Sequence, residues 1–218
     1  FIVNSNQIKK FHKIKRIIKK ISNKSILKIV KPNEKGPVFS ILQSLNLSNK
    51  SDIIISYCDF KVNWSYKNFK KEIKNYDGAI PCFQGMHPAS FGETYYAYTK
   101  VNKNNNLIKL KEKESFTAKR ENEFASTGIY YFKNWEIFEH YARILLNSSD
   151  SKFKESYVSL IYNFMISDNY KVLITSVKHF ICWGTPRDLD HYNFWSNFFQ
   201  NENLKISETK SFNNQVNI

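Results

Sequence analysis

The sequence predicts an α/β fold with a mixed, mainly parallel central sheet flanked by helices. Up to residue 84, short apolar runs rich in β-branched residues alternate with segments in which apolar residues recur at spacings of three and four. This alternation of strands and helices is typical of parallel sheets with right-handed crossovers. Beyond residue 84, alternating or aromatic runs joined by polar loops predict antiparallel strands, or strands mixed into the sheet edge.

The first sixty residues supply the strand and helix alternation. Their predicted elements are the end of a strand at 1–4, a basic amphipathic helix at 5–21, a strand at 25–30, a loop at 31–36, a helix at 37–45 and a buried strand within 51–60. Pro37 suits the first turn of its helix, where proline costs no hydrogen bond. The strand within 51–60 stops at an acid, Asp59.

The rest of the chain is predicted to contain further strands and helices and one loose end. In order, these are a helix at 66–75, strands at 78–84, 94–101, 107–113 and 125–132, helices at 135–146 and 155–167, strands at 171–177 and 179–183, and a helix from 186 to about 199. Residues 200–218 are polar and aperiodic, which predicts a loose tail. Since no linker separates these elements, we expect one domain over residues 1–199.

The net charge of +14 makes nucleic acid one partner to consider. The lysines are spread along the chain, however, and no RNA-binding signature or zinc-finger spacing accompanies them. A basic surface also suits substrates that carry several phosphate charges. We therefore predict small phosphorylated partners and no nucleic acid.

The three cysteines are far apart and lie in apolar runs, as is typical of reduced, buried thiols in a cytoplasmic protein. The five histidines show no pairing at the spacings of a zinc site. No stretch approaches the roughly 18 continuous apolar residues of a membrane span. These patterns predict a soluble protein without zinc.

Asp59 is the first candidate functional residue. The carboxyl end of a buried strand opens onto the crevice where α/β sheets bind ligands, and an acid there can hold Mg²⁺ together with a triphosphate. The alternative is that Asp59 is a turn or helix-cap residue.

Two candidates lie in loops. Gly36, directly before Pro37, would let the backbone approach a flat ligand because it has no Cβ, or it is simply a turn glycine before a helix. His87 lies in the long connection after the strand at 78–84, where it could contact a phosphate or hydroxyl group or be an ordinary surface histidine.

The run Lys111-Glu-Lys-Glu114 ends a predicted strand. Because alternate strand residues face the same way, we expect either both glutamates or both lysines to point inward, and Lys113 could neutralise a phosphate. Charge runs of this kind are also common on solvated surfaces.

Gly128 and Glu155 complete the candidates. Gly128 interrupts the strand at 125–132, which suggests a close backbone approach by a ligand or neighbour. Glu155 is predicted to open a helix, where a favourable interaction with the helix dipole would explain an acid. Thr185, Pro186 and Asp188 make a good helix start and need no functional explanation.

The order of these motifs resembles the sugar-nucleotidyltransferase family, the nucleoside-diphosphate-sugar pyrophosphorylases. The motifs are Tyr-Cys-Asp59-Phe, Glu-Lys-Glu114, Ala125-Ser-Thr-Gly128, Glu155-Ser-Tyr-Val-Ser and Trp183-Gly-Thr-Pro-Arg-Asp-Leu189. The resemblance extends from about Phe1 to Trp195 and is strongest to capsule and lipopolysaccharide cytidylyl- or uridylyltransferases. It implies a glycosyltransferase-A-like, Rossmann-like α/β fold.

The resemblance also implies a reaction. A phosphorylated sugar or similar small molecule would attack the α-phosphorus of CTP or UTP and release pyrophosphate, with Mg²⁺ as the cofactor. Asp59 matches the metal-binding acid, and Gly36 with Pro37 matches the nucleotide-binding loop. Glu112 and Gly128 match acceptor-side contacts, and Lys113 is the matching phosphate partner.

His87 and Glu155 are the remaining predicted substrate-side residues. A homo-oligomer is compatible with these features, and the oligomeric state has no sequence signal.

Two positions depart from the family pattern. The glycine-rich triphosphate loop that follows the family's first strand is absent, so the sequence is predicted to lack the front of the domain. Where most members carry a second metal-binding aspartate, this chain has Cys182, and a thiol is a poor Mg²⁺ ligand. A weaker metal site, a site that uses Asp188 instead, and a lost activity all follow as alternatives.

Two other function classes therefore stay open beside the nucleotidyltransferase. A metal-dependent glycosyltransferase of related fold would usually place a second acid two residues after Asp59, where this chain has Lys61. A non-catalytic, regulatory homologue would account for the missing triphosphate loop.

Overall fold

The computed structural model describes residues 1–45, 51–85, 96–148 and 154–213, with the backbone alone over 202–213. Two units are distinguished within the chain. Unit 1 comprises Phe1–Ser56 and Ser65–Val177, and unit 2 comprises Tyr57–Trp64 and Lys178–Ile218. The prediction of one domain over residues 1–199 stays a prediction, and the two units are described separately below.

Unit 1 is built on a seven-stranded sheet. Its strands are β3 (Ile53–Ser56), β5 (Gly78–Phe83), β6 (Ala97–Val101), β7 (Leu107–Glu112), β8 (Phe124–Ser126), β9 (Ile129–Phe132) and β10 (Val172–Ser176). Among the described strands of this sheet, only β5 and β10 pair in parallel. The pairs of β3 with β9, of β5 with β8 and β9, and of β6 with β7 and β8 are antiparallel. The mixed α/β class is confirmed, but the prediction of a mainly parallel sheet is wrong.

The sheet is mainly antiparallel because of how its strands are connected. A parallel neighbour requires a crossover of a dozen or more residues, and the loop between β6 and β7 is too short for one. The strand β3 follows two helices, which suggested a parallel partner, yet it pairs with β9. The predicted antiparallel character of the strands beyond residue 84 is confirmed for β6 to β9.

The run formed by β8 and β9 is interrupted at Gly128, as the sequence predicts. On β5, residues Cys82–Phe83 pair with β8, while Gly78–Ala79 pair with β9. Gly128 has a φ of 88°, a value that favours glycine. Beside it, the backbone N–H and Oγ1 of Thr127 both donate to the carbonyl of Pro81, at 3.1 and 2.9 Å. Hydrogen bonds to Pro81 of β5 therefore hold the kink in place.

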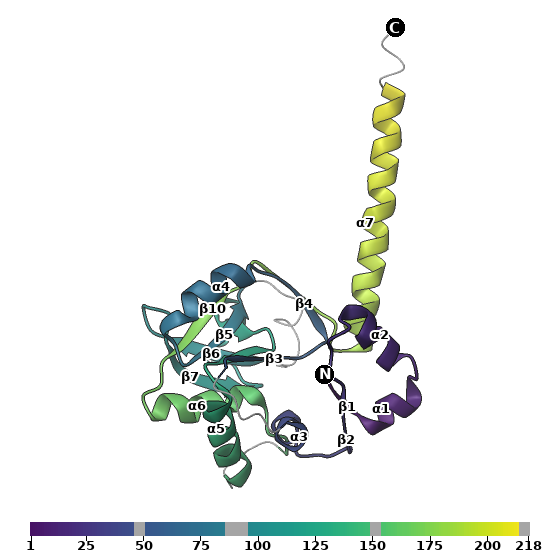
Figure 1. The fold of residues 1–218 in the computed structure, drawn as a ribbon. Helices are drawn as coiled ribbons and strands as arrows, with labels where there is room; N and C mark the ends of the chain where they lie inside the picture. The colour runs from purple at the N-terminus through teal and green to yellow at the C-terminus, as the bar shows by residue number, and fades with distance from the viewer. Residues whose placement is uncertain (46–50, 86–95, 149–153, 214–218) are drawn as a thin grey trace. The chain divides into compact units, whose positions relative to one another are not determined.

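Helices cover both faces of this sheet. In the view of Figure 1, α4 (Tyr66–Glu72) lies above the sheet, and α5 (Trp135–Asn147) and α6 (Ile161–Ser167) lie below it. Two adjacent residues of β9 illustrate the layers, because neighbouring strand residues face opposite sides. Tyr131 meets Phe69 of α4 at 6.1 Å between ring centroids, and Phe132 meets Phe138 of α5 at 5.2 Å.

Within unit 1, the first thirty residues form a small parallel β-α-β motif with a sheet separate from the seven-stranded one. The strands β1 (Ile2–Asn4) and β2 (Lys28–Val30) pair in parallel, as strand–helix–strand order predicts. The helix predicted over 5–21 is broken into α1 (Ser5–Lys10) and α2 (Ile14–Ile21). The helix α3 (Pro37–Ser44) follows β2 and contacts it.

Unit 2 contains the antiparallel pair β4 (Phe60–Asn63) and β11 (His179–Cys182), and the helix α7 (Pro186–Asn213). The strand β4 was not expected from the sequence. The predicted loose tail is wrong for residues 200–213, which continue α7. None of the helices within the described ranges has the length and apolar character required to cross a membrane.

The predicted start of the last helix is confirmed. The backbone N–H of Asp188 donates to Thr185 Oγ1 at 3.2 Å, and the backbone N–H of Thr185 donates to Asp188 Oδ2 at 3.0 Å. This reciprocal pair is a capping box.

Candidate functional site

The end of β7 carries an acid and a lysine with opposite environments. Glu112 is 7% exposed, and the next residue, Lys113, is exposed. The expectation that either both glutamates or both lysines of the run point inward is wrong. Glu112 is buried while Lys113 and Glu114 are exposed, and Glu114 pairs with Lys111 at 2.6 Å. Lys113 has a φ of 53°, so the backbone leaves the strand conformation between the two glutamates. Only Glu112 is therefore turned into the protein.

The carboxyl group of Glu112 has one hydroxyl partner. Ser159 is fully buried, and its Oγ donates a hydrogen bond to Glu112 Oε2. Burial raises the pKa of Glu112 to about 7, although the hydrogen bond from Ser159 and the charge of Lys113 both act in the opposite direction. Near neutral pH, both the acid and the carboxylate form of Glu112 are therefore populated.

Lys113 is held by a single aromatic residue. Its Nζ donates to the hydroxyl of Tyr157 at 2.5 Å and lies 4.5 Å from the centroid of the same ring. The hydrogen bond to Tyr157 raises the pKa of Lys113, which keeps the ammonium charged. The site thus presents one exposed cation beside one buried acid.

Tyr157 and Ser159 belong to a short stretch, residues 155–159, that also contacts the loop at Gly36. The backbone N–H of Ser156 donates to the carbonyl of Lys35 at 2.8 Å, and its carbonyl accepts from the backbone N–H of Val38 at 3.2 Å. Gly36 has a φ of 91°, and a Cβ there would lie 2.7 Å from Ser156 N. The close approach expected at Gly36 is thus made by the chain itself.

The surroundings of Glu155 differ from the prediction. The helical region begins only at the 3₁₀ turn η4 (Val158–Leu160), which continues into α6. Glu155 is therefore an exposed loop residue and opens no helix, so the helix dipole does not explain it. It lies beside Gly36, where a Cβ would approach the Cβ of Glu155 at 3.0 Å.

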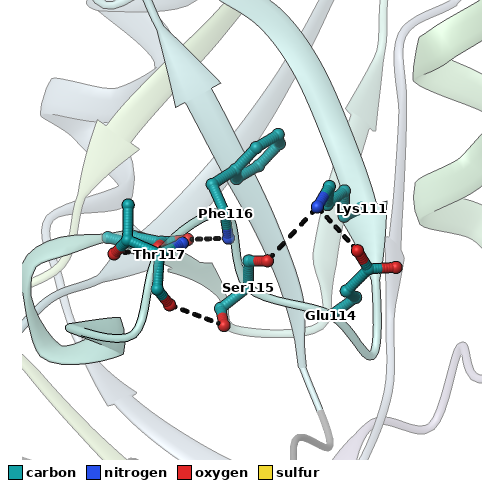
Figure 2. Close-up of polar contacts among 6 residues, drawn as sticks. Lys111, Glu114, Ser115, Phe116 and Thr117 are labelled. Atoms are coloured by element: carbon teal, nitrogen blue, oxygen red, sulfur yellow. Dashed lines mark hydrogen bonds and ion pairs between the residues drawn. The ribbon is translucent and has the colours of Figure 1, made fainter.

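The loop after Lys113 is fixed by its own polar contacts (Figure 2). Lys111 Nζ bonds to Glu114 Oε1 and to the carbonyl of Ser115, at 2.6 and 3.4 Å. The carboxylate of Glu123 accepts from the backbone N–H groups of Phe116 and Thr117, at 2.9 and 2.6 Å. These bonds hold the backbone that follows the left-handed residue Lys113.

A second group of candidates lies in unit 2, around Gly184. A Cβ at Gly184 would be 3.4 Å from both Asp59 Oδ2 and Cys182 Sγ. The carbonyl of Asp59 also accepts from the backbone N–H of Trp183 at 2.7 Å. Asp59 and Cys182, the two positions that the family resemblance pairs, are therefore neighbours. Asp59 directly precedes β4 instead of ending β3.

The cysteine prediction holds in part. All three cysteines are free, but only Cys82 is buried, while Cys58 is exposed and Cys182 is half-buried. Among the described residues, no group of three or more histidine, cysteine, aspartate or glutamate side chains is arranged to hold a metal ion.

The donors around Gly184 suit a divalent cation only in a limited way. Asp188 Oδ2 already accepts from the backbone N–H and Oγ1 of Thr185, at 3.0 and 2.8 Å, and Cys182 offers a soft sulfur. Of the two carboxylates, Asp59 is exposed and is the more available, because Asp188 is engaged by Thr185. Mg²⁺ commonly binds through one or two carboxylates together with substrate phosphates, and this donor set fits that mode.

The remaining predicted residues are placed as follows. Pro37 is the first residue of α3, and Gly128 is buried in the kink between β8 and β9. His87 lies outside the described residues. Gly36, Glu112, Lys113 and Glu155 are brought together in unit 1 through residues 155–159, and Asp59 lies in unit 2.

Sequence reasoning missed Tyr157 and Ser159 as members of this site. Both lie in the run Glu155-Ser-Tyr-Val-Ser, of which only the acid drew attention. No local periodicity marks the two residues, because Tyr157 has an extended backbone whereas Ser159 lies in the η4 turn.

Comparisons with known proteins concern the family and the fold of the chain. The family model described as nucleotidyl transferase matches residues 1–177. The structure of a nucleoside-diphosphate-sugar pyrophosphorylase from Vibrio cholerae RC9 is similar, with a TM-score of 0.71 and 17% identity over 88% of this chain and 78% of that one. The inositol-1-phosphate CTP transferase from T. maritima is also similar, with a TM-score of 0.57 and 12% identity over 86% and 70%. No curated protein matches the sequence significantly.

Proposed function

Because the chain belongs to the nucleotidyl transferase family, we propose that it transfers a nucleoside monophosphate from CTP or UTP to a phosphorylated sugar or similar small molecule. Pyrophosphate is the second product. The observation that carries the acceptor class is the pair at the end of β7, where an exposed lysine adjoins a buried acid. Such a pair matches an acceptor that has both a phosphate and hydroxyl groups. The product would serve surface-polysaccharide assembly from the cytoplasm.

In the proposed reaction, an oxygen of the acceptor phosphate forms a bond to the α-phosphorus of the triphosphate. The bond from the α-phosphorus to the bridging oxygen breaks, and pyrophosphate leaves with that electron pair. Lys113 would neutralise the acceptor phosphate, which lowers the repulsion between the two anions. Glu112 would bind a hydroxyl of the acceptor, as acceptor of a hydrogen bond when ionised and as donor when protonated.

The other predicted residues have roles within the same proposal. Gly36 and Pro37 would form the nucleotide side, while Gly128, Glu155 and His87 would lie on the substrate side. Members of the family generally use a divalent metal, and we propose Mg²⁺ with Asp59 as its protein ligand. When bound, the ion would neutralise charge on the triphosphate.

The names of the two similar structures support this acceptor class. One is a nucleoside-diphosphate-sugar pyrophosphorylase, and the other transfers from CTP to inositol 1-phosphate. Both names describe a nucleotide joined to a small phosphorylated polyol or sugar, and the second favours CTP as the donor to test first.

The test is pyrophosphate release by the full-length protein with CTP or UTP, a panel of sugar and polyol phosphates, and Mg²⁺. We expect release that depends on the metal and falls at least about 100-fold in Asp59→Ala, a change of roughly 2.7 kcal/mol in the barrier. Asp190→Ala, which removes an exposed acid elsewhere in unit 2, is the matched control and should leave the rate unchanged. Wild-type release from Asp59→Ala would contradict the assignment of Asp59.

One observation favours a second candidate, a homologue that binds nucleotide without turnover. Cys182 stands beside Asp59 where most members have a second aspartate, and sulfur is a poor ligand for Mg²⁺. Cys182→Asp separates the two candidates. An inactive homologue would gain pyrophosphate release with this variant, whereas an enzyme that works with one carboxylate would show it already in the wild type.

A further inference from the structure

We infer that residues 155–159 form a positioning segment, in which Ser159 orients Glu112, Tyr157 orients Lys113 and Ser156 fixes both to the loop at Gly36. The inference deepens the proposed function and depends on it for its meaning in the reaction. Its geometric part, that these side chains set the state of Glu112 and Lys113, can be tested without any substrate.

The segment is anchored at its start by the backbone. Ser156 uses both its N–H and its carbonyl on the Gly36 loop, with the carbonyl of Lys35 at 2.8 Å and the N–H of Val38 at 3.2 Å. Because Gly36 has no Cβ, the two segments of the chain can approach each other this closely. The Gly36 loop therefore cannot shift without moving Ser156 or breaking these two hydrogen bonds.

The segment is anchored at its other end by burial. Val158 and Ser159 are both fully buried, and they open the η4 turn that leads into α6. Ser159 donates to Glu112 from this rigid position, so the carboxyl group cannot rotate without losing its hydroxyl donor. A buried carboxylate without that donor would be left with an unsatisfied oxygen, which is costly.

Tyr157 orients the flexible side chain of Lys113, as Ser159 orients Glu112. A lysine has four rotatable bonds, and its ammonium is ordered here by both the hydroxyl and the ring face of Tyr157. An ammonium that is already ordered loses less freedom when a phosphate arrives. The charged neighbour of Glu112 is Lys113, and Glu155 is a further charge near Lys113. Residues 155–159 therefore contact both Glu112 and Lys113 and include the third charged residue, Glu155.

The first arm of the test measures two side-chain pKa values by NMR in the free protein, with labelled glutamate and lysine. Ser159→Ala should raise the pKa of Glu112 above its wild-type value of about 7, because the hydrogen bond from Ser159 lowers it. Tyr157→Phe should lower the pKa of Lys113, because the hydrogen bond to Tyr157 raises it. The separate variant Ser159→Thr keeps a hydroxyl at this position and should leave the pKa of Glu112 near its wild-type value.

Ser115→Ala is the matched control. Its hydroxyl donates to the carbonyl of Thr117 in the loop that follows Lys113. This variant should leave both pKa values unchanged. A pKa of Glu112 that stays at its wild-type value in Ser159→Ala would overturn the inference, whatever the protein's activity.

The second arm uses pyrophosphate release. Tyr157→Phe should raise the KM for the phosphorylated acceptor about 5- to 10-fold and leave the KM for the triphosphate unchanged. Ser159→Ala should move the pH profile of kcat/KM for the acceptor to higher pH. Equal changes in both KM values, or an unmoved profile, would overturn the role in the reaction. If no acceptor supports release, the proposed function fails, while the NMR arm still decides the positioning.

Discussion

At the scale of single residues, the identity of the site residues is readable from sequence, but their environments are not. The run Lys111-Glu-Lys-Glu114 suggested an alternating strand end, and alternation would have turned both glutamates the same way. The left-handed backbone at Lys113 separates them, so Glu112 is buried and Glu114 lies outside. The loop that follows Lys113 is held by Glu123, a contact that no local pattern encodes.

The raised pKa of Glu112 predicts a specific pH dependence of stability. Its pKa of about 7 lies above the ordinary 4.5, so the folded protein holds this proton more tightly than the unfolded chain does. The stabilisation is complete below pH 4.5 and is lost as the pH rises through 7, with a total of about 3 kcal/mol.

Glu112→Gln removes the titration but keeps the shape of the side chain. The wild type should therefore lose stability relative to Glu112→Gln as the pH rises from 5 to 8, as measured by the free energy of unfolding in urea titrations. A difference that is constant over this range would mean that Glu112 titrates normally.

At the scale of elements, the sequence predicts where strands and helices lie better than it predicts their partners. Strand β5 and helix α5 fall within one residue of their expected bounds. The pairing of β3 with β9 joins residues far apart in the chain, and periodicity carries no information on such contacts. The same holds for the contact of residues 155–159 with the N-terminal end of α3, where two loops meet.

That contact predicts unequal effects of two similar glycine substitutions. Gly36 and Gly85 both have positive φ, at 91° and 98°. A Cβ at Gly36 would meet Ser156 N at 2.7 Å, whereas among the residues that the structure describes a Cβ at Gly85 would meet nothing within 4 Å. Both alanine variants suffer backbone strain of about 1 kcal/mol or more, and Gly36→Ala adds a steric clash. Chemical denaturation should show the larger loss of stability for Gly36→Ala, by roughly 1–3 kcal/mol. Equal losses would show that the clash is relieved by movement.

At the scale of the whole molecule, the charge is distributed unevenly. No acid precedes Glu34, so the first part of the chain has only positive charges. Its basic residues are Lys9, Lys10, Lys13, Lys15, Arg16, Lys19, Lys20, Lys24, Lys28 and Lys31. The lysines are spread along the sequence, as expected, but the acids that would balance them are not. The like charges within residues 9–31 repel one another, and added salt screens that repulsion.

The molecule should therefore become more stable with moderate salt. From about 20 to about 200 mM NaCl, we expect the thermal midpoint to rise by about 2–4 °C, which corresponds to roughly 1 kcal/mol for a chain of this size. The triple variant Lys13→Gln, Lys15→Gln, Lys20→Gln should reduce this rise. Lys67→Gln, Lys71→Gln, Lys74→Gln, placed around α4 where acids are near, is the control with an equal charge change. An equal effect of both triple variants would show that only the total charge matters.

The left-handed lysine at the end of β7 has a consequence for how substitutions would be tolerated. Glycine and asparagine accept that backbone readily, but neither carries a charge, and arginine keeps the charge with a broad planar head instead of a compact ammonium. No replacement meets both demands at once. Lys113 would consequently behave in a mutational scan like a core position although it lies on the surface, and solvent exposure would be a poor guide to which residues evolution can exchange in this protein.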